Sequence, residues 1–570
     1  MRRPARPVAE PAGGGPGAAS ASWRKGTSMP VNATYPGVYI HEVKSRVRTI
    51  TGVPTSTAAF VGSAPRGPVD RPVHITGWAD YEKQFGGLDR DSPMSYAVHQ
   101  FYLNGGREAE IVRLVGGSVT VEFPIGKGPT DVAGDRPVLK AASPGSWARK
   151  LRARVDHDTI PDTNGTLYNL TIRDCGSGLE ERYRNISTDS KSPRSLGNVL
   201  SGSRLVTVKT EGTGLPPAHD SPQKPSDDPL ECREDEEGVP PTTEEASGEE
   251  TAFFSAPETT PQADDDLPPK ANHYSGANGS PAAKTGIYQL LKTDIFNLLC
   301  LPDCPEEILT DALKLCVERR AVLLVDPPQA WTVDGVQLDT VVTGALNPPL
   351  KGPPARNAAL YFPRVLAPDR MRDDTITAFP PCGVMAGVLA RTDAERGVWK
   401  APAGTDASLN GVIGLEMPLT DVENGRLNPL GINCLRLLPG VGPVAWGART
   451  LRGADRLADE WKYLPVRRLA LFVEESLFRG TQWVVFEPND EPLWSSIRLN
   501  VGAFMNSLFR EGAFQGRTPE EAYLVKCDRE NNPQNDIDRG IVNIQVGFAP
   551  LKPAEFVIIH IEQLAGQIQT

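Results

Sequence analysis

The stretch IFNLLCLPDCPEEILTDALKLCVERRAVLLVDPP, residues 295–328, predicts the fold class of this chain. Its first apolar run is typical of a strand that ends at Asp303. Asp303 is placed to cap a following helix, whose first turn, CPEE, carries the proline and acidic residues favoured at a helix start. The text EEILTDALKLCVERR predicts that helix, and the continuous apolar run in AVLLVDPP is typical of a parallel strand buried on both faces. NAALYFPRVLAPD, residues 357–369, predicts another strand. Strand, helix and strand in this order predict a right-handed βαβ layout.

Residues 58–115 repeat this pattern near the start of the chain. AAFVG (58–62) predicts a short buried strand, SPMSYAVHQFYL (92–103) has apolar residues at helical spacing, and AEIVRLV (109–115) predicts a second strand. Residues 117 to about 210 differ, because GTLYNLTIRD and SRLVTVKT alternate polar and apolar residues as antiparallel strands do. We therefore expect a β-rich domain inserted into an α/β core.

The net charge of −11 is concentrated in one acidic, proline-rich segment. Residues 220–269 hold 16 Asp and Glu residues against Lys224 and Arg233, so the rest of the chain is nearly neutral. Residues 211–285 are poor in bulky apolar side chains, and we expect a long disordered loop because such a segment cannot bury enough surface to order itself. The nearly neutral remainder argues against nucleic-acid binding through bulk charge.

The first 28 residues are rich in Pro, Gly, Ala and Ser and lack the apolar core of a signal peptide. We expect them to form a disordered extension, and we expect translation to begin at Met29. The chain contains no run of about 18 apolar residues, so we expect no transmembrane helix and no direct membrane insertion.

Signatures of enzymes and metal sites are weak. Cys300, Cys304 and Cys316 form the only cysteine cluster, and without paired CxxC or HxxxH spacing the preferred interpretation is buried thiols in a reducing compartment. Seven scattered histidines leave few bases for nucleophilic catalysis. GKGPT (126–130) lacks the glycine spacing of a phosphate loop, and GVGPVAWG (440–447) lacks the helix that follows a dinucleotide loop. We expect no catalytic, cofactor-binding or metal-ligating residue and no cofactor.

Two apolar strands without hairpin partners stand near the two ends of the chain. YPGVYIHEV (35–43) is followed by a basic segment, and FVIIHI (556–561) would be an aggregation hazard if it were left exposed. Pro36 and Gly37 make the first strand better suited to joining a sheet edge than to founding a sheet. The two strands either pair within one protomer or add to a sheet of another chain.

Several motifs together resemble one family. They are YPGVYIHEV, PTSTAAFVGSAPRGPVDRPVHITGWADYEKQFGG, NGGREAEIVRLV, NPLGINCLRLLPGVGPVAWGARTL and PAEFVIIHIEQL, in this order. Their combination resembles the sheath protein of contractile phage tails and related contractile injection systems. The resemblance covers residues 33 to about 116 and 286–570, whereas the middle insert and the N-terminal extension have no counterpart in the family pattern.

The resemblance implies a structural sheath subunit, not an enzyme. Such subunits polymerise as helically stacked six-fold rings around an inner tube, and contract from an extended metastable state to drive the tube through a target envelope. The implied partners are further copies of the chain, the inner tube protein, and baseplate and terminal cap proteins, with no nucleic acid. The implied location is a phage tail-like particle or virion tail assembled in the bacterial cytoplasm.

In this family, terminal arms of neighbouring protomers complete a shared sheet. The resemblance carries the arm role onto the residues of the two terminal strands: Tyr35, Val38, Tyr39, Ile40, Val43, Phe556, Val557, Ile558, Ile559 and Ile561. Lys462, Arg467 and Arg468 form a basic group at the start of a helix predicted over residues 467–486, and are candidates for contact with an acidic inner tube. The alternative for each of these three is a solvated helix end.

The expected fold class is therefore mixed α/β and α+β, with a discontinuous core from the N- and C-terminal parts, an inserted β-rich domain and terminal strand arms. The alternatives are a polysaccharide-active enzyme with a β-rich binding insert, and a non-contractile baseplate or structural component. The expected boundaries are a disordered extension at 1–28, an N-terminal arm at 29–48, core segments at 49–116 and 286–394, the insert at 117–285, a C-terminal domain near the inner tube at 395–552 and a C-terminal strand arm at 553–570.

Overall fold

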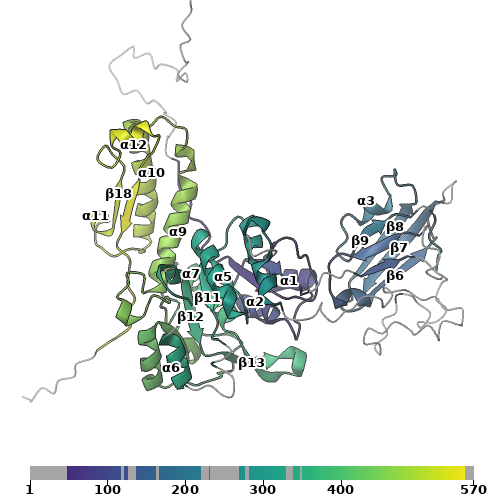
Figure 1. Ribbon diagram of the computed structural model, residues 1–570, viewed down its shortest axis with the longest axis horizontal. Helices are drawn as coiled ribbons and strands as arrows, with labels where there is room; N and C mark the ends of the chain where they lie inside the picture. The colour runs from purple at the N-terminus through teal and green to yellow at the C-terminus, as the bar shows by residue number, and fades with distance from the viewer. Residues whose placement is uncertain are drawn as a thin grey trace, which may run out of the picture. The chain divides into compact units, whose positions relative to one another are not determined.

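The structure is a computed structural model of the 570-residue chain. It describes residues 48–116, 121–125, 136–161, 166–212, 214–219, 230, 269–276, 281–328, 331, 338–346 and 350–558. Its central element is an eight-stranded sheet that joins segments from both ends of the sequence (Figure 1). In spatial order the strands are β17 (Gly442–Ala445), β16 (Ile432–Leu438), β12 (Ala358–Phe362), β11 (Val322–Val325), β10 (Leu298–Cys300), β1 (Ala58–Gly62), β3 (Ala109–Arg113) and β2 (Val73–Ile75).

The six inner strands of this sheet are parallel, and β17 and β2 pair antiparallel at the two edges. Strand β1 pairs with β10 in the register Ala59 to Leu299, although the two strands lie more than 200 residues apart in the sequence. The core sheet is therefore discontinuous in the chain. The helices of this core are α1 (Trp78–Phe85), α2 (Pro93–Leu103), α5 (Glu306–Glu318), α6 (Leu338–Leu346), α7 (Cys382–Arg396) and α8 (Asp421–Leu427).

Successive residues of the central strands point to opposite faces of the sheet, and helices cover both faces. Phe60 of β1 and Leu324 of β11 lie in one apolar cluster with side chains of α2 and α7. Ala59 and Leu323, one residue earlier on the same strands, lie in a second cluster with side chains of α5. Burial on both faces explains the continuous apolar runs of these strands. The predicted α/β class is confirmed.

The predicted capping role of Asp303 is wrong. The residue before α5 is Pro305, which makes no side-chain cap, and Asp303 adopts a φ of 52°. Its carboxylate instead binds the guanidinium of Arg364, which follows β12. The strand, helix and strand are present as predicted, but an ion pair between two loops has taken the place of the cap.

Two further expectations about this core need correction. The strand predicted at 357–369 is two strands: β12 ends at a cis Phe362–Pro363 bond, and β13 (Val365–Asp369) pairs with β14 (Thr375–Phe379) and β15 (Gly414–Leu415) in a separate small sheet. The expected boundary between residues 394 and 395 would cut through the central sheet, because β16 and β17 lie beyond it, with β16 paired to β12 and β17 paired to β16.

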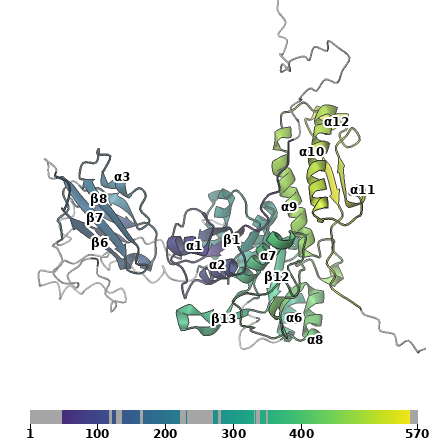
Figure 2. The same cartoon turned by 180° about the vertical axis from the view of Figure 1, so that it is seen from behind.

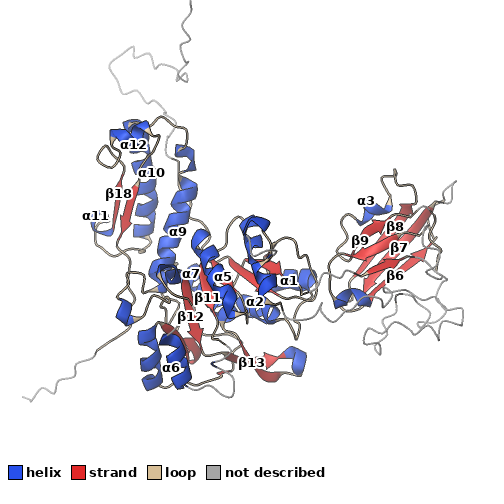
Figure 3. Ribbon diagram, viewed as in Figure 1, coloured by secondary structure: helices blue, strands red, loops and turns tan. Residues whose placement is uncertain are grey.

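The segment after β3 forms two small antiparallel sheets, whose strands are drawn in red in Figure 3. The two sheets have their own apolar cluster. The first sheet orders its strands β4-β5-β9 and the second β6-β7-β8. Polar and apolar residues alternate along β6, whose burial alternates in step. The bounds are β4 (Glu122–Pro124), β5 (Val138–Ala141), β6 (Leu151–Asp156), β7 (Leu167–Asp174), β8 (Glu180–Ser187), α3 (Leu196–Leu200) and β9 (Val206–Thr210), with α4 (Ala271–Ser275) before the chain re-enters the core.

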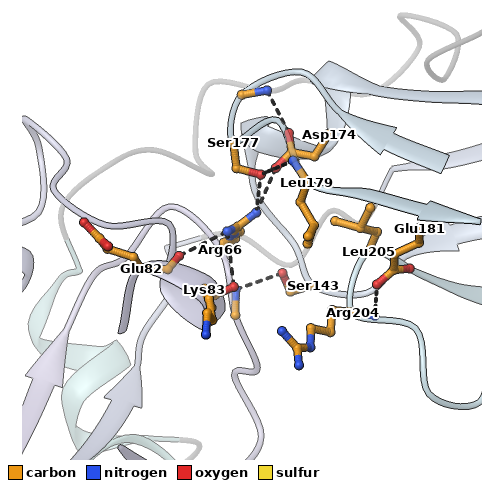
Figure 4. Close-up of polar contacts among 12 residues, drawn as sticks. Arg66, Glu82, Lys83, Ser143, Asp174, Ser177, Leu179, Glu181, Arg204 and Leu205 are labelled. Carbon is orange, nitrogen blue, oxygen red and sulfur yellow. Dashed lines mark hydrogen bonds and ion pairs between the residues drawn. The ribbon is translucent and has the colours of Figure 1, made fainter. Parts of the chain in front are cut away.

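A buried ion pair ties β7 to the loop that follows β1 (Figure 4). Arg66 Nη1 lies 2.8 Å from Asp174 Oδ2 and also donates to Ser177 Oγ, while its Nη2 donates to the carbonyls of Glu82 and Lys83 at the end of α1. The side chains of Arg66 and Asp174 are only 9% and 3% exposed. The insert is therefore connected to the core by a charged hydrogen-bond network as well as by the chain itself.

A helical unit follows the central sheet toward the C-terminus. Helices α9 and α10 run side by side in Figures 1 and 2, and their apolar stripes share one cluster, with Phe472 and Phe504 at a centroid distance of 6.1 Å. None of the helices in the described part of the chain is long and apolar enough to span a membrane. The elements of this unit are α9 (Leu464–Gly480), α10 (Glu491–Arg510), α11 (Pro519–Ala522), β18 (Tyr523–Lys526), α12 (Gln534–Asp538) and β19 (Gln545–Phe548).

Candidate assembly site

Strands β18 and β19 form an antiparallel sheet of two strands on the C-terminal helical unit. Tyr523 pairs with Phe548 and Val525 with Val546, and these four side chains are partly buried against the cluster of α9 and α10. Leu524, on the opposite face, is 52% exposed. Within the described residues neither strand has a third strand beside it. The sheet therefore has one packed face, one solvent face and two open edges.

The C-terminal segment leaves β19 as an extended chain without regular secondary structure over residues 551–558. The first three predicted arm residues in it, Phe556, Val557 and Ile558, are 74%, 82% and 78% exposed. Ile559 and Ile561 lie outside the described residues, as do all five of the predicted N-terminal arm residues, Tyr35, Val38, Tyr39, Ile40 and Val43. Three consecutive large apolar side chains are therefore exposed in the single chain, a pattern that is typical of interaction sites.

A group of four charged residues holds the start of this segment, and we call it the arm-root cluster: Arg449, Asp455, Lys462 and Glu555. Arg449 Nε and Nη2 lie 2.8 and 2.5 Å from the two carboxylate oxygens of Glu555. Arg449 Nη1 lies 3.0 Å from Asp455 Oδ1, and Lys462 Nζ lies 2.7 Å from the same oxygen. Two cations and two anions balance the charge of the cluster.

The pKa values of this cluster follow from burial and pairing. Burial alone would lower the pKa of Arg449, but the hydrogen bonds and the charge of Glu555, together with Asp455, raise it above its ordinary value. The hydrogen bond from Lys462 lowers the pKa of Asp455. Both shifts favour the charged forms of Arg449 and Asp455.

A cavity of about 750 Å³ lies beside the arm root. It combines two indole rings with cations and carboxylates, and Trp446, at its wall, is 38% exposed. Its lining includes Trp399, Lys400, Trp446, Glu511, Pro553 and Phe556. The cavity is bounded on one side by the C-terminal segment itself, so its shape depends on where that segment runs.

The three predicted tube-contact residues do not form the exposed helix end that the sequence indicated. Lys462 belongs to the arm-root cluster. Arg467 and Arg468, in the first two turns of α9, are each only 4% exposed. Arg467 donates to Asn357 Oδ1 and stands over the ring of Trp461 at 4.9 Å. Because these guanidinium groups are buried and paired inside the protomer, tube contact stays a prediction for Lys462 only.

A carboxyl group of the kind that an enzyme interpretation would need lies at the carboxyl end of the parallel strand β11. Asp326 follows β11, accepts a hydrogen bond from the Cys382 amide at 2.9 Å, and keeps its other oxygen, Oδ2, buried. Burial, with the nearby charge of Asp303, raises the pKa of Asp326 to about 7. In the part of the chain that the structure describes, no group of three or more His, Cys, Asp or Glu residues is arranged to hold a metal ion.

The thiols match the sequence interpretation except at one position. Cys300 and Cys316 are buried and free, and Cys304 is free and partly buried. Burial raises the pKa of Cys304 and of Cys316. Cys175, by contrast, is disulfide-bonded, which departs from the expectation of reduced thiols throughout.

The residues that hold the arm root and α9 were missed by the sequence interpretation. Arg449 and Glu555 are 106 residues apart, and Arg468 and its partner Asp393 are 75 apart. No spacing rule links such residues, because their proximity exists only in the folded chain. The one available signal was the presence of charged residues inside apolar text, as in PVAWGARTL.

Two family models match the chain. Residues 277–451 match the phage tail sheath protein central domain, and residues 458–563 match the phage tail sheath C-terminal domain. The division between them falls after β17 and before α9, in agreement with the limits of the central sheet. The central-domain match contains β10 to β17 and Arg449, and the C-terminal match contains β18, β19, Lys462 and Glu555.

Curated relatives match over one segment. The tail sheath protein of Vibrio phage KVP40 is 28% identical over 182 residues, which is 32% of this chain and 26% of the relative. The putative prophage major tail sheath protein of Pseudomonas aeruginosa is 26% identical over 180 residues, 31% of this chain and 44% of the relative. The aligned region therefore spans less than half the length of these relatives.

Solved structures match over most of the chain. The helical sheath of the anti-feeding prophage in its contracted state is 22% identical, with a TM-score of 0.52 over 93% of this chain and 99% of that chain. The sheath tail protein of Listeria innocua is 12% identical, with a TM-score of 0.54 over 88% and 96% of the two chains. At these identities the matches establish a shared fold.

Proposed function

Because this chain belongs to the phage tail sheath family, a family of structural proteins and not of enzymes, we propose that it is the subunit of a contractile sheath. In this proposal the protomers form helically stacked six-fold rings around an inner tube and shorten from an extended state to drive the tube through a target envelope. The observation that carries the proposal is the combination, in one protomer, of an exposed apolar terminal segment and a two-stranded sheet with open edges.

The open sheet supports strand exchange between protomers. An isolated two-stranded antiparallel sheet is marginally stable, and three or more strands make such a sheet more stable. An added strand forms main-chain hydrogen bonds along the free edge of β18 or β19, and its alternate side chains extend the packed face of Tyr523 and Phe548. Phe556, Val557 and Ile558 supply such a strand, with apolar side chains for both faces.

Exchange of arms between protomers produces an open helical polymer. An arm that enters a neighbour's sheet makes a heterologous contact, and heterologous contacts repeated with a rise generate helical assemblies rather than closed dimers. Rigid protomers joined by flexible arm linkers can keep their contacts while the lattice changes its rise and twist. The free energy of contraction is stored when the extended state assembles, so the mechanism needs no nucleotide site.

The partners follow from the same proposal. The sheath subunit contacts further copies of itself, an inner tube, and baseplate and terminal cap proteins, within a phage tail or tail-like particle in bacteria. Lys462 is our remaining candidate for contact with the tube, because it is a member of the arm-root cluster and 24% of its side chain is exposed.

Negative-stain electron microscopy of the protein expressed with its native particle genes tests the proposal. We compare the full chain with a chain lacking residues 29–43 and a chain lacking 556–570, which retains Glu555. Striated tubes from the full chain, and folded protomers without tubes from both deletions, are expected. Tubes that form equally well from both deletions would rule out strand exchange. Tubes that never change length on treatment with acid or denaturant would instead favour the non-contractile structural component.

A further inference from the structure

We propose that Arg449 anchors the C-terminal arm to the central sheet and thereby fixes the point at which the arm leaves the protomer. The inference rests on the proposed function, in which the segment after Glu555 is an arm that joins a neighbouring protomer. The contact between Arg449 and Glu555 lies within a single protomer. Arg449 is a positioning residue in this proposal: it acts on the arm through Glu555 and does not touch the neighbouring protomer.

The burial of Arg449 gives the anchor its strength. Its side chain is 0% exposed, and a guanidinium in the interior must be paired to be tolerated. All three nitrogen atoms of its guanidinium group donate hydrogen bonds. Nε and Nη2 donate to Glu555, and Nη1 donates to Asp455 and to the carbonyls of Asn428 and Gly453. Loss of Glu555 would leave only the half-exposed carboxylate of Asp455 to balance a buried charge.

The anchor continues from Arg449 into the central sheet through Asn433 of β16. The Asn433 side chain accepts from the backbone N–H of Arg449 at 2.6 Å and donates to the Arg449 carbonyl at 2.8 Å. It also donates to the carbonyl of Leu360 in β12 at 3.1 Å, and Asn433 is fully buried. Glu555, at the start of the arm, is therefore connected to the backbone of the central sheet through the side chains of Arg449 and Asn433.

The geometry selects arginine and glutamate at these positions. A guanidinium presents a planar fork that matches both oxygens of a carboxylate, and this pairing fixes direction as well as distance. The residue after Glu555, Phe556, is already 74% exposed. The fixed part of the chain therefore ends at Glu555, and the exchanged strand begins at the next residue.

The test measures the position of the arm in the isolated protomer. Spin labels are attached at Val557→Cys and Val422→Cys, two exposed sites, and the distribution of distances between them is measured by pulsed electron paramagnetic resonance. The variants are Glu555→Ala, which removes the carboxylate, and Glu555→Gln, which keeps a hydrogen-bond acceptor without the charge. The matched control is Asp455→Ala, which removes the other carboxylate partner of Arg449 but leaves the contact with the arm.

The expected result is a distance distribution that is at least roughly two-fold broader in Glu555→Ala, because a lost charge-assisted pair frees the arm root. A smaller broadening is expected in Glu555→Gln, and the distribution of Asp455→Ala is expected to match that of the parent chain. An unchanged width in Glu555→Ala, or equal broadening in Asp455→Ala, would overturn the anchor.

Electron microscopy of the same variants separates the anchor from the proposed function. With an anchored arm, Glu555→Ala yields fewer or shorter tubes than the parent chain at a temperature at which circular dichroism shows that the variant protomer is still folded. If the parent chain itself forms no tubes, the sheath proposal fails while the spin-label result still decides whether Arg449 anchors the segment.

Discussion

Arg468 and Asp393 form a bidentate ion pair with both side chains only 3% exposed. The two Nη nitrogens of Arg468 lie 2.7 and 2.6 Å from the carboxylate oxygens of Asp393, and Nη2 also donates to the carbonyl of Thr55. The pair joins the start of α9 to the end of α7 and to the segment that precedes β1. The C-terminal helical unit is thus attached to the core by a buried charge pair.

Substitution Asp393→Ala is expected to destabilise the protein by about 3–5 kcal/mol, because it leaves the buried guanidinium of Arg468 without its counter-charge. The measurement is chemical denaturation of the isolated protomer. The matched control is Asp294→Ala, whose exposed pair with Arg479 is expected to contribute at most about 1 kcal/mol. Equal effects of the two substitutions would contradict a structural role for burial at Arg468.

The Arg66–Asp174 pair predicts how firmly the insert is held. Asp174→Ala is expected to weaken the free energy of association between the insert and the core by about 1.5–3 kcal/mol, the usual range for hydrogen bonds to charged groups. Small-angle X-ray scattering of the protomer reports this as a wider range of particle dimensions, and cryo-electron microscopy reports it as weaker density for β6, β7 and β8. The control Glu180→Ala breaks an exposed pair with Arg182 in the same domain. A variant at Asp174 that scatters like the parent chain would show that the chain connections alone hold the insert.

The buried carboxyl of Asp326 predicts a pH dependence of stability. Its pKa in the folded protein is about 7, above the ordinary value of 3.8, so the fold favours the protonated form. The resulting stabilisation is complete below pH 3.8, decreases as the pH rises toward 7, and is absent above that pH, with a slope of at most about 1.4 kcal/mol per pH unit. Asp326→Asn removes this titration. The stability of the variant relative to the parent chain is therefore expected to rise between about pH 4 and pH 7 in urea unfolding, and a constant difference over that range would refute the prediction.

The exposed arm predicts a substitution that separates assembly from folding. Val557→Lys places a charge on a side chain that is 82% exposed, so the free energy of unfolding of the protomer is expected to change by no more than about 0.5 kcal/mol. Tube formation is expected to be lost, because a lysine cannot enter the packed face of a neighbouring sheet without desolvation. Val422→Lys, at another site that is 77% exposed, is the control and should form tubes as the parent chain does. Normal tubes from Val557→Lys would place the interprotomer strand elsewhere.

Local sequence was a good guide wherever local rules decide the structure. The apolar run AVLLVDPP became β11, and the text EEILTDALKLCVERR became α5, because strand burial and helix periodicity are properties of neighbouring residues. The turn GVG between β16 and β17 obeys a local rule as well, since Gly440 and Gly442 adopt the positive φ that favours glycine. The helix predicted at 467–486 is α9 over Leu464–Gly480, which begins three residues and ends six residues earlier than predicted.

The interpretation of charged residues was less successful, because charge can be satisfied by partners that are distant in sequence. Arg467 and Arg468 look like an exposed basic end of a helix in the sequence, but each is buried in the fold. Asp303 looks like a helix cap, but it pairs with Arg364 across 61 residues. A charged residue in apolar surroundings indicates that a partner exists, and only the folded chain shows which residue it is.

The sequence by itself determined the α/β class, the inserted β-rich domain and the apolar character of the terminal segments, since these depend on periodicity and composition along the chain. Only the tertiary structure decided that β1 lies beside β10, that Glu555 meets Arg449, and that Arg468 meets Asp393. The physical reason is that a hydrogen bond or an ion pair depends on distances of about 3 Å in space, which the order of residues along the chain does not encode directly.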